Sequence, residues 1–203
     1  YDLEKIAMAL EKGEIADLTV PDNGFVKGEK VEAYVNRMIR GTTMENLRIP
    51  FYAVATDIGS GEEMVFGKGN TGSAVRASCA IPGVFQPVRI GDRTYVDGGV
   101  VSPVAVDAAR RLGADVVIAV DISKGVSGAI PDTTLDTIFQ SIGVMYAKIA
   151  AAQLPRADVV IQPKVGYIAS GDFTKRHEAI LEGEKAAQAA LPRIRALLGE
   201  SVR

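Results

Sequence analysis

The tripeptide Asp97-Gly98-Gly99 places a carboxylate and two glycines directly after the apolar end of a predicted strand. A carboxylate at a strand end is well placed to act as a general base. Two glycines let the backbone turn sharply and approach a ligand closely. The same three residues also suit a plain turn, because aspartate tolerates turn geometry and bonds its own backbone. Taken alone, the tripeptide leaves a catalytic base and a structural turn both open.

A second segment, from Gly67 to Gly72, matches the pattern G-x-G-x-x-G and comes before a predicted helix. Such a helix N-terminus can hold the pyrophosphate of a dinucleotide. The preceding strand begins with two acidic residues, however, and Pro82 cuts the following helix short. The context favours a glycine-rich loop that leads into a helix, and nucleotide binding is kept only as an alternative hypothesis.

The chain has one histidine, His177, and one cysteine, Cys79. A Ser-His-Asp triad needs a histidine that reaches both partners, whereas His177 lies in a charged stretch typical of a solvated surface. One histidine and one cysteine are too few for an expected transition-metal site or an intrachain disulfide. The pattern G-x-S-x-G, which marks the nucleophile elbow of many serine hydrolases, does not occur in these 203 residues. We therefore expect no metal and no cofactor.

Hydrophobic periodicity predicts alternating helices and strands that could position these residues. The predicted helices cover residues 2–12, 29–40, 71–80, 103–112, 134–154 and 175–198, and the predicted strands cover residues 50–58, 63–66, 87–90, 94–96, 115–120 and 158–162. The run 115–120 is continuously apolar, which is typical of a strand covered on both faces of a parallel sheet. The pattern predicts a three-layer α/β/α sandwich with a mostly parallel central sheet, and a flexible loop over residues 123–132.

The composition indicates a globular protein and gives information on its class of binding partner. Apolar residues make up 47% of the chain and charged residues 24%, which suits one globular domain over residues 1–203. The net charge of −2 gives no reason to expect a nucleic-acid partner. No apolar run reaches the roughly 18 residues of a membrane span. The chain begins at Tyr1 with no initiator methionine, so we expect a portion of a longer protein and leave its localisation open.

Several motifs in a fixed order carry a family resemblance: Ala55-Thr-Asp-Ile58, then Arg76-Ala-Ser-Cys-Ala-Ile-Pro-Gly-Val-Phe-Gln-Pro87, Tyr95-Val-Asp-Gly-Gly-Val100, Pro103-Val104, Leu112-Gly-Ala-Asp-Val-Val-Ile118 and Asp172-Phe173. In this order they resemble the bacterial patatin-like phospholipases. The resemblance implies an α/β lipid acyl hydrolase that cleaves acyl esters with a Ser-Asp dyad. It assigns the base to Asp97, with Gly98 and Gly99 shaping the turn, and it implies a lipid or acyl-ester substrate and peripheral contact with a membrane.

The same resemblance implies two features that these residues lack. A glycine-rich oxyanion loop and the G-x-S-x-G elbow should precede Tyr1. We therefore expect the chain to be the C-terminal portion of a patatin-like domain, with the N-terminal segment that carries the serine as its partner. The isolated chain is then expected to be inactive. The alternative is a non-catalytic lipid- or protein-binding module on the same scaffold.

Overall fold

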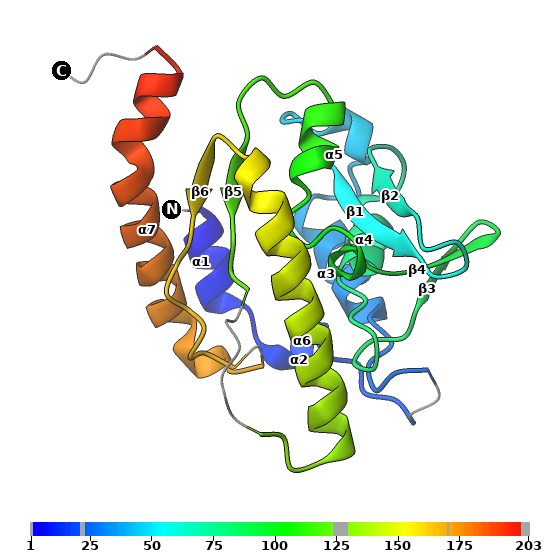
Figure 1. The fold of residues 1–203 in the computed structure, drawn as a ribbon. Helices are drawn as coiled ribbons and strands as arrows, with labels where there is room; N and C mark the ends of the chain where they lie inside the picture. Colours follow the sequence, from blue (N-terminus) through cyan, green and yellow to red (C-terminus); the bar gives the residue numbers. More distant parts are fainter. Residues whose placement is uncertain (1, 21–22, 124–129, 170, 200–203) are drawn as a thin grey trace. The chain divides into compact units, whose positions relative to one another are not determined.

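The computed structural model describes residues 2–20, 23–123, 130–169 and 171–199. The chain divides into two compact units. Figure 1 labels the helices and strands of each. We call Leu10–Ser102 the antiparallel unit, and Tyr1–Ala9 with Pro103–Arg203 the parallel unit, after the sheet that each contains. Most of the predicted flexible loop over residues 123–132 lies outside the described residues.

The antiparallel unit contains a four-stranded sheet with the strand order β2-β1-β4-β3. Its strands are β1 (Ala53–Asp57), β2 (Glu63–Phe66), β3 (Val88–Ile90) and β4 (Arg93–Asp97). All neighbouring pairs are antiparallel. Gly61 and Gly91 adopt positive φ angles in the two tight connections, which favours glycine. The two hairpins predicted from turn signals are therefore confirmed.

Helices cover this sheet and set the position of β4. The antiparallel unit contains the helices α2 (Lys12–Ile15), α3 (Glu29–Met38) and α4 (Thr71–Ser78) and the short 3-10 turns η1 (Met44–Asn46) and η2 (Gly98–Val100). Ala77 in the last turn of α4 and Ala80 just after the helix pack with Ala55 and Tyr95 of the sheet in one buried cluster. Alanine side chains are small, so the helix can lie close to the strands.

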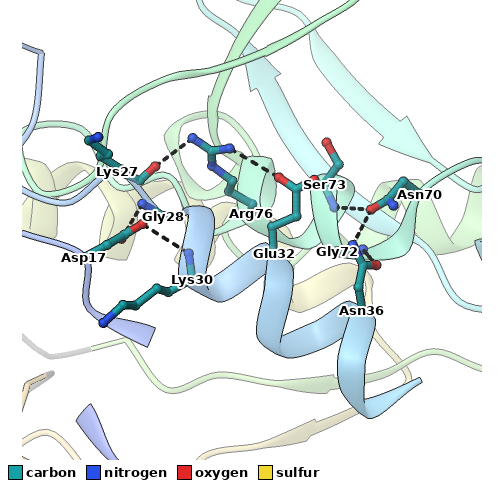
Figure 2. A network of polar contacts seen from close by, with 10 residues as sticks. All are labelled: Asp17, Lys27, Gly28, Lys30, Glu32, Asn36, Asn70, Gly72, Ser73 and Arg76. Carbon is teal, nitrogen blue, oxygen red and sulfur yellow. Dashed lines mark hydrogen bonds and ion pairs between the residues drawn. The ribbon is translucent and has the colours of Figure 1, made fainter. Parts of the chain in front are cut away.

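Two asparagines position the N-terminus of α4 (Figure 2). The Asn70 side chain accepts a hydrogen bond from the Ser73 N–H at 2.8 Å, and Asn36 of α3 accepts one from the Gly72 N–H at 3.1 Å. The Asn36 amide also donates to the Asn70 oxygen at 3.1 Å. The first amides of α4, which a helix leaves without internal partners, are therefore bound by side chains of this unit.

Arg76 links α4 to the segment that begins α3 (Figure 2). Its guanidinium contacts the Glu32 carboxylate at 3.2 Å and donates to the Lys27 carbonyl at 2.8 Å. Just beyond that carbonyl, Asp17 accepts a hydrogen bond from the Gly28 N–H at 2.7 Å, where a carboxylate also complements the helix dipole. The arginine of the Arg-Ala-Ser motif therefore has a structural part in fixing two helices together.

The parallel unit contains the helices α1 (Asp2–Ala9), α5 (Val106–Arg111), α6 (Thr134–Gln153) and α7 (Arg176–Leu197), and the strands β5 (Ile118–Val120) and β6 (Val159–Ile161). The two strands are parallel. Val106, Val117 and Ala119 form its buried core cluster. The Arg176 guanidinium donates to the Met8 carbonyl at 2.6 Å and so ties α7 to α1.

The predicted mixed α/β class is confirmed. The prediction of a mostly parallel sheet is wrong for the strands in the described ranges. The connections within β1–β2 and β3–β4 are too short for a crossover, which takes a dozen or more residues, so these strands can only pair antiparallel. The prediction that the apolar run 115–120 is covered on both faces is also wrong. In β5, Ala119 is buried, while Ile118 and Val120 are 42% and 55% exposed. None of the helices described here is long and apolar enough to cross a bilayer.

Candidate active site

The backbone of Asp97 is held in place from two sides. In the β1–β4 ladder, Asp97 lies opposite Ala55. Its N–H donates to the Ala80 carbonyl at 2.9 Å, just after α4, and its carbonyl accepts a hydrogen bond from the Thr56 hydroxyl at 3.0 Å. These contacts fix the origin of the Asp97 side chain, as a positioned acid or base requires.

The Asp97 carboxylate has one engaged oxygen and one open oxygen. Oδ1 accepts a hydrogen bond from the Gly99 N–H at 2.6 Å, so the side chain caps the 3-10 turn that follows β4. Oδ2 accepts no hydrogen bond from any residue that the structure describes. Desolvation by partial burial raises the pKa of Asp97, and this outweighs the Gly99 N–H, which lowers it. The carboxylate is thus more basic than an exposed one and has an oxygen available for a proton.

Gly98 permits a close backbone approach beside this carboxylate. A Cβ at this position would lie 2.7 Å from the carbonyl carbon of Val54 and would overlap the oxygen of that carbonyl. Gly98 has no positive φ angle, so space and not turn handedness requires a glycine. Gly98 and Gly99 are both buried. Together they bring η2 against β1 and present the amide that binds Asp97.

Cys79 lies close to Asp97, which no sequence signal indicated. The cysteine follows α4 directly and is exposed. Although the residue as a whole is exposed, partial desolvation of its thiol raises the pKa of Cys79, and the negative charge of Asp97 raises it further. This electrostatic interaction places the thiol and the carboxylate in one neighbourhood. Only the fold could show it, because it depends on the contact between the end of α4 and the end of β4.

The other candidates from the sequence lie in different surroundings. His177 is exposed in the first turn of α7, in the parallel unit. In the glycine-rich run, the Gly69 N–H donates to the Glu45 carboxylate at 2.8 Å, and the Gly72 and Ser73 amides are bound by asparagines. These amides are not open to a phosphate group, so the geometry speaks against a nucleotide site there.

Comparison with known proteins identifies the family of this chain. A family model described as patatin-like phospholipase matches residues 5–110. An NTE family protein of Mycobacterium bovis is 27% identical over 205 residues, covering 87% of this chain and 35% of the relative. The lysophospholipase NTE1 of Chaetomium globosum is 25% identical over 81% of this chain and 11% of its own length.

A mammalian relative contains the same region. The mouse patatin-like phospholipase domain-containing protein 7 is 31% identical over 112 residues, which are 54% of this chain and 8% of the mouse protein. The chain therefore spans about a third or less of the length of these three relatives. The matched residues contain both β4 and Asp97, and they cover more than half of the chain. The motifs around Asp97 thus indicated the right family, and the chain belongs to the patatin-like phospholipases.

Proposed function

We propose that this chain is the base-bearing part of a lipid acyl hydrolase and that Asp97 is its general base. The observation that carries the proposal is the half-buried Asp97 carboxylate, which has a fixed backbone, a raised pKa and an open Oδ2. Membership of a phospholipase family supports a lipid or acyl-ester substrate. The lysophospholipase name of the Chaetomium relative supports the same class of substrate.

In this proposal the nucleophile is a serine outside residues 1–203. Asp97 Oδ2 takes the proton of the serine hydroxyl while the serine oxygen bonds to the acyl carbonyl carbon. Backbone N–H groups hold the resulting oxyanion. The carbonyl reforms, the bond to the alcohol breaks, and Asp97 returns the proton to the leaving oxygen. Asp97 then takes a proton from water while the water oxygen bonds to the acyl carbonyl carbon. The bond to the serine oxygen breaks, the fatty acid is released, and Asp97 returns the proton to the serine.

Partial burial suits Asp97 to this role. An ordinary aspartate, with a pKa of about 4, is a weak base toward a hydroxyl group at neutral pH. Desolvation raises the pKa of Asp97 and so increases its affinity for a proton. The Gly99 N–H on Oδ1 fixes the side-chain direction, which leaves the proton to be taken at Oδ2. The turn thus orients the base as well as supporting it.

We further propose that residues 1–203 are the C-terminal portion of a patatin-like domain with a three-layer α/β/α core. Exposed apolar side chains in the parallel unit support this proposal, because Ile118, Val120 and Ile122 would be covered by neighbouring strands or helices. A substrate in a membrane also implies peripheral contact with lipid. In the antiparallel unit, Leu18 and Val20 are 80% and 84% exposed and are the side chains that we propose for that contact.

The variant Asp97→Asn tests the function in the longest natural polypeptide that contains these residues. Loss of a general base costs roughly 10²–10⁴-fold in rate, so ester hydrolysis should fall by that factor. Asparagine can still accept the Gly99 N–H, so circular dichroism should show an unchanged fold. The matched control is Asp92→Asn, the same change at an exposed hairpin residue, which should retain full activity.

Substantial ester hydrolysis by Asp97→Asn would overturn the assignment of the base. Absence of any hydrolysis by the wild-type polypeptide, tested on phospholipid, lysophospholipid and short esters, would instead favour the non-catalytic lipid- or protein-binding module.

A further inference from the structure

An apolar groove with a volume of about 570 Å³ lies in the antiparallel unit between α3, α4 and the segment that follows η1. This volume falls within the roughly 300–1,000 Å³ of small-molecule sites. Six apolar side chains form most of its wall: Val35, Ile39, Leu47, Ile49, Phe51 and Val75. The groove is therefore a candidate binding site that does not include Asp97 itself.

The polar side chains that line this groove are already bound within the protein. The Thr71 hydroxyl donates to the Thr42 carbonyl at 2.9 Å, and the Thr42 hydroxyl donates to the Ile39 carbonyl at 2.6 Å. The Asn46 amide donates to the Thr43 hydroxyl at 2.8 Å. A ligand in the groove therefore meets mainly hydrocarbon, with the exposed Arg48 as the one charged lining residue. This chemistry fits an unbranched alkyl chain and not a charged headgroup.

The flank of α4 connects the groove to the neighbourhood of Asp97. Thr71, Val75 and Cys79 follow one another at intervals of four residues, so they share one side of the helix and its end. Thr71 and Val75 line the groove, and Cys79 lies near Asp97. Four residues, a rise of about 6 Å in helical geometry, separate Val75 from Cys79. The groove thus lies beside the flank of α4 whose C-terminal end is near the carboxylate.

The segment before β1 also connects the groove to the neighbourhood of Asp97. Phe51 lines the groove two residues before β1 begins, and Ala55 within β1 pairs with Asp97. An ester carbonyl beside Asp97 can therefore extend its hydrocarbon tail past Val75 toward Phe51. We propose that this groove binds the acyl chain of the substrate. The inference rests on the proposed function, because it takes the reacting carbonyl to lie at Asp97.

Binding of free fatty acids tests the groove without relying on catalysis. Hexanoate, octanoate, decanoate and dodecanoate, each below its micelle concentration, would be titrated calorimetrically into the full polypeptide and into its Asp97→Asn variant. Each buried methylene group should strengthen binding about fourfold until the groove is full. The affinity should then reach a plateau at a fixed chain length.

Two variants locate the binding. Val75→Phe fills the groove and should weaken dodecanoate binding about tenfold, equivalent to one or two lost methylene contacts, while hexanoate binding changes little. The matched control is Ile58→Phe, which introduces the same side chain at a residue that is 56% exposed and does not line the groove. Ile49→Ser provides a second test. Ile49 is 79% exposed, so its replacement should leave the fold intact and still weaken binding of the long chain.

The outcomes separate the two proposals. Equal affinity for all four acids, or dodecanoate binding that is unchanged in both Val75→Phe and Ile49→Ser, overturns the acyl-chain groove even if the polypeptide hydrolyses esters. Length-dependent binding that both variants weaken supports the groove, even where Asp97→Asn retains hydrolysis and the assignment of the base fails.

Discussion

The two units of this chain complete their sheets by different means. In the antiparallel unit, hairpins bring β2 and β3 to either side of the β1–β4 pair from nearby sequence. In the parallel unit, β5 has β6 as its partner in the described part of the chain, and Ile118 and Val120 remain exposed. Parallel neighbours need long crossover connections. A sheet of that kind therefore depends on distant segments, whereas a set of hairpins can be completed locally.

Asp97 lies in the antiparallel unit, whose described strands pair with one another within residues 53–97. Its backbone is bound by Ala80, just after α4, and by Thr56 of β1, both within the same unit. A base works only when its carboxylate is held close to the productive geometry. The difference between the units suggests that the position of Asp97 depends little on what covers β5. The following predictions test this contrast, beginning with the largest expected effect.

Replacing a glycine by alanine should change the free energy of unfolding in opposite directions at one position in each unit. In Gly98→Ala the new Cβ overlaps the Val54 carbonyl, so the free energy of unfolding should fall by about 1–3 kcal/mol or more. In Gly143→Ala, within α6, the new Cβ has no heavy atom within 4 Å, and alanine should stabilise the helix by up to about 1 kcal/mol. Urea unfolding of both variants measures the difference. A neutral Gly98→Ala would remove the argument that η2 needs a close approach to β1.

Lowering the pH should change the contributions of Asp158 and Asp97 to stability in opposite directions. The Val117 N–H, at 2.7 Å, and the Arg110 guanidinium lower the pKa of Asp158 below its ordinary 3.8. Its stabilising effect is therefore present above pH 3.8 and is lost as the pH falls through the lowered value. Burial raises the pKa of Asp97 above 3.8, so its favourable contribution is present below pH 3.8 and is lost as the pH rises through the raised value.

Unfolding experiments across this pH range distinguish the two carboxyl groups. Asp158→Asn should lower stability at pH 7 and reduce the loss of stability on acidification below pH 3.8. Asp97→Asn should raise stability at pH 7 and have little effect once the wild-type carboxyl is protonated. The same raised pKa predicts that ester hydrolysis in the full polypeptide falls as Asp97 takes up a proton. A destabilised Asp97→Asn at pH 7 would contradict the burial cost assigned to this group.

The smallest effect is expected at the exposed residues of β5. In residues 1–203, Val120→Lys should change the free energy of unfolding by no more than about 0.5 kcal/mol, as is usual for surface sites. Ala119→Lys, at the buried neighbouring position, is the control and should unfold the parallel unit. In a longer natural polypeptide Val120→Lys should become strongly destabilising. An equally small effect there would argue against further polypeptide covering β5.

The sequence predicted best those features that depend on local signals. Gly61 and Gly91 indicate hairpin turns regardless of how the rest of the chain folds, and both hairpins form. The apolar run before Asp121 indicated a strand, but β5 covers only Ile118–Val120 and is exposed on alternate residues. Apolar character shows what a strand could bury. It does not show which neighbours are present to bury it.

At the candidate site, too, the sequence predicted the features with local signals and missed those that depend on the fold. The Asp97 tripeptide and its flanking motifs pointed to the family, which the family model confirms. The close approach of Gly98 to Val54 could not be read from the residues, because it depends on the register of two strands distant in sequence. The open Oδ2 of Asp97 likewise depends on which amide the turn presents to Oδ1. The role of Asp97 as a base stays a prediction.

The lone thiol beside Asp97 also offers a direct way to observe the site. Cys79 is the single cysteine of the chain and is exposed, so a maleimide dye or spin label can be attached there and nowhere else. Thiol alkylation needs the thiolate, and the charge of Asp97 disfavours that form. Labelling should therefore be slow at neutral pH and faster in Asp97→Asn. The alkylation rate would report the protonation state of the carboxylate in the folded protein without any substrate.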